Sequence, residues 1–382
     1  MFNLAIICGG PSLERGISLN SARSLMDHLS SSNITIHPIY VDLEKNFYKI
    51  SCGQLYSNTP YDFDFKLAQT AQKLSTDLLI QTLKGVDLVF PVIHGAYGED
   101  GELIALLEKA NIPFVGHSSI TCRNMFNKHI AAEILKKNGF HTLPSLLIEA
   151  IDLASIETFF QQHALKKAVI KPTAGGSSIG VSVVTSPEEA VQKASQYPGP
   201  MILEPFCDGK EFTVVVLQNP DKSVTALMPT EIEISYENNQ IFNYRRKYLP
   251  TANTFYHTPA RFDFDVIQKI GSQAECIFRL FQMQDFARLD GWLLKDGTLF
   301  FSDLNPISGM EQNSFLFRQA ALSGMSHKQI LLNIIHNACI RHNVASPQIP
   351  EPIFPAPKKP VFVLFGNYTS ERQVSLMTGV NV

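Results

Sequence analysis

Charged side chains and cysteines are both sparse in this sequence of 382 residues. Only 18% of the residues are charged and the formal net charge is −3, which excludes a basic protein that coats nucleic acid. The six cysteines form no Cys-x-x-Cys pair, so neither a disulfide framework nor a structural zinc site is expected. No apolar run approaches the roughly 18–20 residues of a membrane span, and the N-terminus lacks the pattern of a signal peptide. We therefore expect a cytoplasmic protein that binds neither nucleic acid nor membranes.

The apolar content, 45% of the residues, is sufficient for several domains with cores of their own. Residues 1–121 alternate segments typical of strands and helices, which predicts βαβ units on a parallel, Rossmann-like sheet. Strands are expected at 4–8, 34–41 and, after a long polar insert, 86–92, with a helix at 18–29. In such sheets ligands bind at the carboxyl ends of the strands. The glycine-bearing turn at 9–14 and loop at 94–101 are therefore expected to face one crevice.

The middle of the chain is expected to form two further units. Residues 122–206 predict an α+β unit whose strands flank a glycine- and serine-rich loop at 175–180. Residues 207–345 predict a mostly antiparallel unit whose strand ends are rich in Asp, Asn and Arg. The expected helices lie at 124–138, from 187 onward, at 265–282 and at 328–342, and the expected strands at 168–171, 181–184, 201–204, 212–218, 226–234, 287–294 and 299–304. The fold class is therefore α/β followed by α+β.

The C-terminal part has two unusual segments. Residues 346–360 are rich in proline and are expected to form an extended linker without a core. The segment 361–382 aligns without gaps onto the chain from Leu4, which places Glu371 on Glu14. It is interpreted as the start of a second copy of the protein, and chance similarity between two strand–turn–helix segments is the alternative. A strand and half a helix bury no face alone, so this segment is expected to pack on the first unit or to be loose.

A predicted strand ends in Lys171 and runs into the loop Pro-Thr-Ala-Gly-Gly-Ser-Ser-Ile-Gly180. Such a loop can turn several backbone N–H groups toward one anion, and the lysine adds a charge at the phosphates. Neither a GxxxxGK[ST] nor a GxGxxG motif is present, so nucleotide binding cannot be inferred by those routes. A plain β-hairpin with an exposed lysine is the alternative for this loop alone.

Two neighbouring predicted strands carry chemically active side chains at alternate positions. Arg288 and Asp290 share one face of the first strand, as Asp303 and Asn305 do on the second. The turn Lys-Asp-Gly-Thr between them predicts a hairpin that brings the oxygen-bearing side chains together. Such ligands suit Mg²⁺ bridging nucleotide phosphates, and an arginine beside them suits phosphoryl transfer. A solvated hairpin with exposed charges is the alternative.

Together these motifs resemble those of the D-alanine–D-alanine ligases of the ATP-grasp superfamily, in the family's order, from residue 3 to about 340. The matching segments are Gly9-Gly-Pro-Ser-Leu-Glu-Arg-Gly-Ile-Ser-Leu-Asn-Ser21, His94-Gly-Ala-Tyr-Gly-Glu-Asp-Gly101, Lys171–Gly180, Glu204 with Glu211-Phe-Thr, Lys247-Tyr248, Arg288-Leu-Asp290, and Asp303-Leu-Asn305 with Gly309-Met310. The resemblance implies an ATP-grasp fold preceded by a parallel-sheet domain. It also implies a reaction in which ATP phosphorylates one amino acid's carboxylate and the amine of a second attacks the acyl phosphate, as in the synthesis of peptidoglycan precursors.

The resemblance implies a nucleotide site and a metal site. ATP would be bound by Lys128, Lys171, Ser178, Glu204, Phe206, Glu211 and Lys247. Two Mg²⁺ ions, with Mn²⁺ as a substitute, would be held by Asp290, Asp303 and Asn305. These ions would neutralise the charge that otherwise repels the attacking carboxylate.

The resemblance also implies roles in catalysis and substrate binding. The catalytic set would be Glu14, Ser177, Tyr248 and Arg288. Glu14 would pair with the ammonium of the first amino acid, Ser177 would connect it to Tyr248 on a closing loop, and Arg288 would stabilise the tetrahedral oxyanion. His94 would lie near the carboxylate of the first amino acid, while Gly309 and Ser314 would receive the carboxylate of the second.

Each of three site residues also has a simpler structural interpretation. His94 follows an apolar strand and could be a buried, hydrogen-bonded histidine. Glu14 could be a first-turn carboxylate favoured by the helix dipole, and Tyr248 a core aromatic.

The sequence departs from the family pattern at its last motif, which normally reads Glu-x-Asn-Thr-x-Pro-Gly-x-Thr. Asp303 replaces the glutamate, and Pro306, Ser308 and Glu311 change the loop that shapes the pocket of the second amino acid. A carboxylate at Glu311 would repel an acceptor carboxylate placed close by. In the loop that the resemblance implies closes over the site, Asn243 stands where the family prefers Asp. The reaction class is therefore predicted more firmly than the acceptor.

Three alternatives remain from the sequence. The chain is predicted to be a D-alanine–D-alanine ligase, and the first alternative is a related ATP-grasp carboxylate–amine ligase with a different acceptor. The second is a non-catalytic ATP-binding module of a tandem protein, and the third a carboxylase-like ATP-grasp protein. The expected partners are ATP and small amino acids, with either a homodimer or an internal contact to the second copy.

Overall fold

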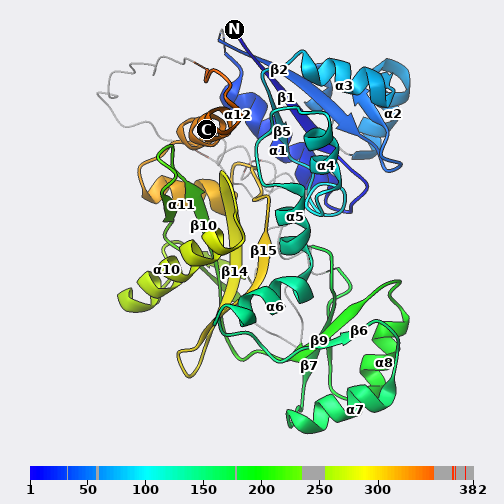
Figure 1. Cartoon of the computed structure of the whole chain (residues 1–382), viewed down its shortest axis with the longest axis vertical. Coiled ribbons are helices and arrows are strands. Elements are labelled where there is room, and N and C mark those ends of the chain that lie inside the picture. The colour runs from blue at the N-terminus through cyan, green and yellow to red at the C-terminus, as the bar shows by residue number, and fades with distance from the viewer. Residues whose placement is uncertain are drawn as a thin grey trace.

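Three β-sheets organise the chain in the computed structural model, which describes residues 1–31, 33–56, 60–176, 179–234 and 254–347 and the single residues Leu364, Gly366 and Ser375. Figure 1 shows an N-terminal sheet at the top, a long antiparallel sheet in the middle and a small sheet at the bottom. None of the described helices is both long and apolar enough to cross a membrane.

The N-terminal sheet contains the predicted parallel strands. Its order is β4 (Gln72–Leu74), β3 (Phe47–Lys49), β2 (Ile34–Val41), β1 (Phe2–Gly9) and β5 (Leu88–Pro91). The central strand β1 runs parallel to both β2 and β5, which confirms the βαβ prediction. The polar insert supplies β3 and β4, which add antiparallel strands to the same sheet.

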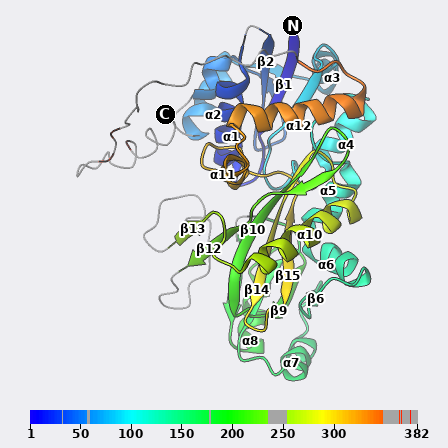
Figure 2. The same ribbon diagram turned by 90° about the vertical axis from the view of Figure 1, so that its left-hand side faces the viewer.

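Helices cover both faces of this sheet because β1 is apolar on both sides. Leu4 and Ile6 face the core that includes α1 (Arg15–Leu29), whereas Ala5 and Ile7 face the core that includes α3 (Thr76–Lys84) and α4 (Glu102–Lys109). The insert also forms α2 (Pro60–Thr70). Figure 2 shows α12 (His327–His342) lying next to α1, so the last described helix packs on the first unit.

The region expected to hold one helix at 124–138 contains two. The helices α5 (Ser119–Phe126) and α6 (Lys128–Lys137) meet at Asn127. The prediction was wrong because the Asn127 carboxamide accepts hydrogen bonds from the N–H groups of His129 and Ile130 and starts a new helix there.

The small sheet follows α6 and is antiparallel. Its order is β6 (Leu146–Ile148), β9 (Met201–Pro205), β7 (Ala168–Pro172) and β8 (Ser182–Val184), with α7 (Leu153–Gln162) and α8 (Pro187–Ser195) packed on it. The glycine- and serine-rich loop connects β7 to β8.

The long sheet is antiparallel, as predicted. It contains β13 (Thr254–His257), β12 (Thr230–Ile234), β10 (Gly209–Gln218), β14 (Phe286–Leu294) and β15 (Leu299–Asn305), with β11 (Val224–Ala226) beside β10 and α10 (Phe264–Leu280) packed against it. The strand expected at 226–234 is wrong. It is divided between β11 and β12, which pair with different parts of β10, and Pro229 between them has no N–H group to donate.

A buried histidine joins the first unit to the long sheet. His117 Nδ1 accepts the Gln284 N–H at 2.8 Å, and its Nε2–H donates to the Pro306 carbonyl at 3.1 Å. Burial and the charge of Arg341 lower the pKa of His117 to about 3. The ring is therefore neutral at ordinary pH and fixes the start of the loop that follows β15.

The C-terminal segment contributes three described residues. The Gly366 N–H donates to Ser375 Oγ at 2.9 Å with φ of +104°, and Gly9 donates to Ser18 Oγ at 2.8 Å with φ of +95°. These are the positions that the sequence alignment pairs. Residues 348–360 of the linker expected at 346–360 lie outside the described residues, and the second-copy interpretation stays a prediction.

Candidate functional site

The nucleotide side of the candidate site begins with an ion pair across the small sheet. Glu204 on β9 is opposite Val169 on β7, which places it diagonal to Lys171 on the same face. Lys171 Nζ lies 2.7 Å from Glu204 Oε2, and both side chains are largely buried. Burial lowers the pKa of Lys171, but the charges of Glu204 and Asp303 outweigh it and raise the pKa above its ordinary value. The lysine is therefore charged.

A second lysine connects the glycine-rich loop to the long sheet. Lys128, the first residue of α6, donates from Nζ to the Gly175 carbonyl at 2.8 Å. The same Nζ lies 3.2 Å from Asp303 Oδ1 on β15. The Lys128 N–H also donates to the Thr173 carbonyl at 2.7 Å. Two positive charges and one loop thus converge between the two antiparallel sheets.

The predicted hairpin forms and places its polar side chains opposite one another. Asp290 on β14 pairs with Asp303 on β15, and Arg288 pairs with Asn305. The Arg288 guanidinium contacts both Asp290 carboxylate oxygens at 3.2 Å. Asn305 Nδ2 donates to Asp290 Oδ2 at 3.0 Å. The hairpin expected from the alternation and the turn therefore forms, and the roles of these four residues stay predictions.

The donors in this hairpin suit a hard divalent cation. Two carboxylates face each other with one amide beside them, and Mg²⁺ takes such oxygens with water and phosphate completing its shell. Nowhere in the described ranges do three or more His, Cys, Asp or Glu side chains form a cluster that could hold a metal. The fit thus rests on Asp290, Asp303 and Asn305.

The two glycine-bearing loops of the first unit meet at Glu14. A Cβ atom on Gly95 or on Gly176 would lie 2.7 Å from Glu14 Oε2, so both glycine backbones lie against this buried carboxylate. The turn at 9–14 and the loop at 94–101 therefore share a crevice, as predicted. A cavity of 560 Å³ lies here, lined by both loops and by the start of the glycine- and serine-rich loop.

His94 is buried at the start of the loop at 94–101, next to Gly95 in the cavity lining. Its Nε2 is 3.3 Å from Ser21 Oγ, which accepts the Met310 N–H at 3.1 Å, and its Nδ1 is 3.8 Å from Glu99 Oε1. Burial lowers the pKa of His94, but the Glu99 carboxylate and, with smaller effects, the charges of Glu14 and Glu311 raise it above its ordinary value. Ser21 and Glu99 had no assigned role, although both belong to the motifs that carry the resemblance.

The loop after β15 carries the expected acceptor residues. Ser314 is the N-cap residue of α11 (Phe315–Leu322), yet its hydroxyl makes no capping hydrogen bond. A Cβ atom on Gly309 would lie 2.5 Å from Glu311 Oε2, so this carboxylate covers Gly309.

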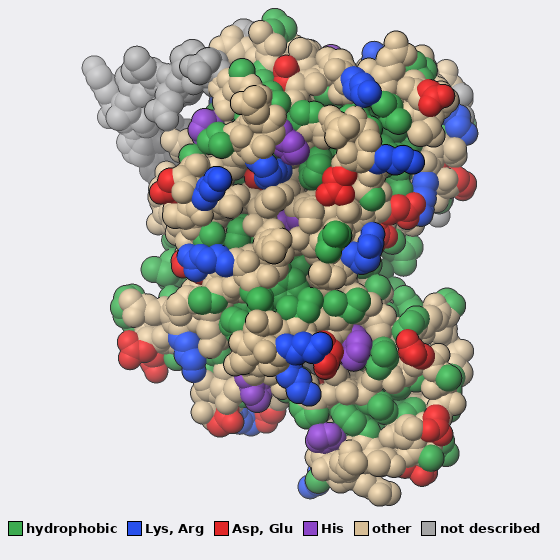
Figure 3. All heavy atoms as spheres, viewed as in Figure 1, with side chains coloured by type: hydrophobic (Ala, Val, Ile, Leu, Met, Phe, Trp, Pro, Cys, Tyr) green, Lys and Arg blue, Asp and Glu red, His purple; other side chains and the backbone are tan. Residues whose placement is uncertain are grey.

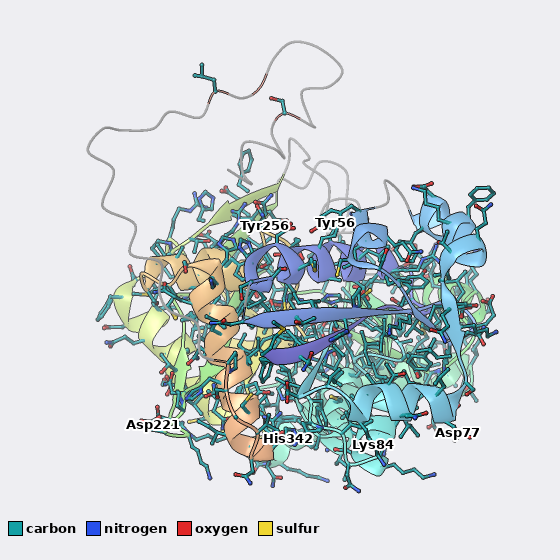
Figure 4. All side chains as sticks on the ribbon, turned by 90° about the horizontal axis from the view of Figure 1, so that it is seen from above. Tyr56, Asp77, Lys84, Asp221, Tyr256 and His342 are labelled. Atoms are coloured by element: carbon teal, nitrogen blue, oxygen red, sulfur yellow. The ribbon has the colours of Figure 1, made fainter. Side chains whose placement is uncertain are left out.

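One residue near this loop was missed by sequence reasoning. Tyr256 on β13 packs edge-on against Phe315 at 5.2 Å, and the Arg318 guanidinium lies 5.6 Å from its ring centre. Burial raises the pKa of Tyr256 to about 12, with Arg318 opposing the rise. Figure 4 labels it on the opposite side of the view from His342. No motif in the sequence identifies this tyrosine.

The remaining expected residues are only partly placed. The Phe206 N–H donates to the Lys167 carbonyl at 3.2 Å, and its side chain is 40% exposed. Glu211 lies on β10, opposite Trp292 on β14. Four expected residues lie outside the described part of the chain: Ser177, Ser178, Lys247 and Tyr248.

Two charged lysines beside a glycine-rich loop, facing the paired carboxylates of a neighbouring antiparallel sheet, define an ATP-grasp fold behind a parallel-sheet domain. Family models agree with this class. A model of the D-ala D-ala ligase N-terminus matches residues 3–117, and one of the D-ala D-ala ligase C-terminus matches residues 134–336. The chain belongs to the D-alanine–D-alanine ligase family.

Individual relatives agree. A D-alanine–D-alanine ligase of Oceanobacillus iheyensis is 27% identical over 354 residues, which cover 89% of this chain and 95% of that protein. The VanG D-Ala:D-Ser ligase from Enterococcus faecalis superposes with a TM-score of 0.76 at 24% identity, over 88% of this chain and 99% of that one. The D-alanine–D-alanine ligase from Coxiella burnetii gives 0.73 at 23% identity, over 90% and 95%.

Proposed function

We propose that this chain is an ATP-dependent ligase that joins two amino acids, with D-alanine as donor, through an acyl phosphate, and so supplies a dipeptide for peptidoglycan precursors in the cytoplasm. The observation that carries the proposal is the convergence of Lys128 and Lys171 with Asp303 beside the crevice that holds Glu14. Phosphates and an amino acid can therefore meet at one point.

The residues of the chain divide the reaction between them. Lys128 and Lys171 would hold the phosphates of ATP, and Glu204 and Glu211 would lie at its adenine and ribose. Glu14 would take the ammonium of the donor, whose carboxylate attacks the terminal phosphorus. Asp290, Asp303 and Asn305 would hold two Mg²⁺ ions, and the positive charge of these ions would offset the negative charge of the phosphates.

The second half-reaction, in which the second amine attacks the acyl phosphate, needs a stabilised oxyanion and a site that excludes water. The Arg288 guanidinium would lie beside the tetrahedral oxyanion that forms when the second amine attacks. The loop that carries Lys247 and Tyr248 would close the site, with Tyr248 connected to Glu14 through Ser177, since an acyl phosphate must be shielded from water. Ser178 would bind ATP.

The test is ADP release with a panel of D- and L-amino acids, with the product identified by mass spectrometry. Release that requires D-alanine and yields D-alanyl-D-alanine supports the proposal. Release that does not depend on any amino acid contradicts it.

A related ligase with another acceptor is the second candidate, because the Glu311 carboxylate covers Gly309. D-Serine belongs in the panel for this reason, and a mixed dipeptide would identify this candidate.

The basic side chains in Figure 3 are scattered among acidic and apolar ones, which supports small-molecule substrates over nucleic acid. A homodimer, or a contact with a second copy, remains the proposed assembly.

A further inference from the structure

The loop that follows β15 holds an unusual set of buried polar atoms. Ser308 Oγ, Glu311 Oε2 and Ser314 Oγ are all buried and have no hydrogen-bond partner among the described residues. The two serines are 0% and 5% exposed. Because buried polar groups are almost always hydrogen-bonded, three such atoms in one short loop point to a ligand that supplies their partners.

The carboxylate in this loop acts electrostatically on groups outside the loop. Glu311 lies over Gly309, and its charge acts on both His94 and Tyr256. Glu14 acts on the same histidine from the donor side. Three carboxylates, Glu99, Glu14 and Glu311, are thus within electrostatic reach of His94. The proposed reaction has so far given a role only to Glu14.

The ligase reaction brings two ammonium groups to this site, one from each amino acid. A carboxylate covering Gly309 repels the acceptor's own carboxylate and attracts its ammonium. The N-terminus of α11 favours negative charge, and the free Ser314 hydroxyl adds a donor there. The Ser314 N–H donates to the Glu311 carbonyl at 2.8 Å, so Glu311 and Ser314 lie one turn apart in the chain.

We propose that Glu311 binds the ammonium group of the acceptor amino acid and takes the proton that this group must lose before it attacks. The acceptor's carboxylate then lies at Ser314, and Gly309 faces the ammonium. This assignment rests on the proposed ligase function and adds to it the base of the second half-reaction.

Glu311 takes part in the step in which the acceptor amine replaces phosphate on the donor. The acceptor ammonium gives one proton to the Glu311 carboxylate, and the free amine attacks the carbonyl carbon of the acyl phosphate. A C–N bond forms, and the bond between the carbonyl carbon and the bridging oxygen breaks. Inorganic phosphate leaves with that oxygen and the electron pair. The nitrogen's second proton goes to the departing phosphate, and Glu311 returns its proton to solvent.

Two nucleophiles separate this role from the rest of the reaction. Hydroxylamine is uncharged at neutral pH, so it captures the acyl phosphate as a hydroxamate without needing a base. With ATP and D-alanine, E311Q should make hydroxamate at the rate of the unmodified protein, whereas dipeptide formation should fall about 10²-fold. The control E149Q, an exposed carboxylate between β6 and α7, should change neither rate.

Two further variants test whether the charge at position 311 is what matters. E311D retains the charge and should recover part of the dipeptide rate, whereas E311T, with the family's residue, should resemble E311Q. A parallel loss of hydroxamate and dipeptide in E311Q would mean that Glu311 only shapes the loop. An unchanged rate of dipeptide formation in E311Q would contradict the role of Glu311 as the base. Failure of the unmodified protein to form hydroxamate with any amino acid would overturn the proposed function and this assignment with it.

Discussion

Lys171 Nζ and Glu204 Oε2 lie 2.7 Å apart on adjacent strands of the small sheet, and the charge of Asp303 acts on the same lysine from the long sheet. A carboxylate on each side therefore keeps this largely buried lysine protonated. The arrangement positions a positive charge at the phosphate site before any nucleotide arrives, which is the electrostatic preorganisation that phosphoryl transfer needs.

Removing this charge is expected to impair nucleotide use. In K171Q the phosphates lose a charged donor and Glu204 loses its partner, so D-alanine-dependent ADP release should fall about 10²-fold. A coupled assay of ADP release measures it. K166Q, which changes an exposed lysine just before β7, is the matched control and should retain the original rate. Equal rates for the two variants would contradict the role of Lys171.

The metal hairpin gives a second prediction. D303N removes one of two facing carboxylates and the partner of Lys128, so the Mg²⁺ concentration needed for half-maximal activity should rise about tenfold or more. Titration of ADP release with Mg²⁺ measures this change. D296N, in the exposed turn of the same hairpin, should leave the titration unchanged. An unaltered Mg²⁺ dependence of D303N would place the metal elsewhere.

Close contact at Glu14 predicts a selective defect in donor binding. In G176A the new Cβ would lie 2.7 Å from Glu14 Oε2 and displace the carboxylate, so the KM for the donor should rise about tenfold, or ~1.4 kcal/mol. Hydroxamate formation at varied D-alanine concentration measures this KM when hydroxylamine, in excess, takes the place of the acceptor amine. G53A is the control, because a Cβ on Gly53 meets nothing within 4 Å. An unchanged donor KM in G176A would place the donor away from Glu14.

The buried histidine predicts a pH dependence of stability. Burial lowers the pKa of His117 from its ordinary value of 6.5 to about 3, so the folded state binds fewer protons than the unfolded state between these values. Its contribution is complete above pH 6.5 and is lost as the pH falls, by about 1.4 kcal/mol of unfolding free energy per pH unit.

Urea titrations at several pH values test this dependence. H117N should be less stable than the unmodified protein at neutral pH but should lose less stability on acidification. H163Q, at an exposed position after α7, should keep the original slope. A steep acid slope retained in H117N would assign the effect to another group.

Local sequence signals were sufficient for much of the fold. The strand expected at 34–41 is β2 with the same bounds, because its apolar run ends at polar residues on both sides. The hairpin that pairs Asp290 with Asp303 followed from alternation and one turn. These are short-range patterns, and neither required knowledge of a distant partner.

Longer-range choices could not be predicted. Nothing in the sequence of α12 indicates that it packs on α1 rather than on the neighbouring sheet. The division of the expected strand at 226–234 depends on which stretch of β10 each half meets. The same holds in the site, where Tyr256 lies beside Phe315 only because β13 extends the long sheet.

The most direct test of the central claim follows the oxygen atoms of the donor. D-Alanine labelled with heavy oxygen in its carboxylate is incubated with ATP, Mg²⁺ and the protein, and the inorganic phosphate is examined by mass spectrometry. An acyl phosphate formed between Lys171, Asp303 and Glu14 predicts one labelled oxygen in each phosphate released. Phosphate without label, at the same extent of ADP formation, would contradict the account.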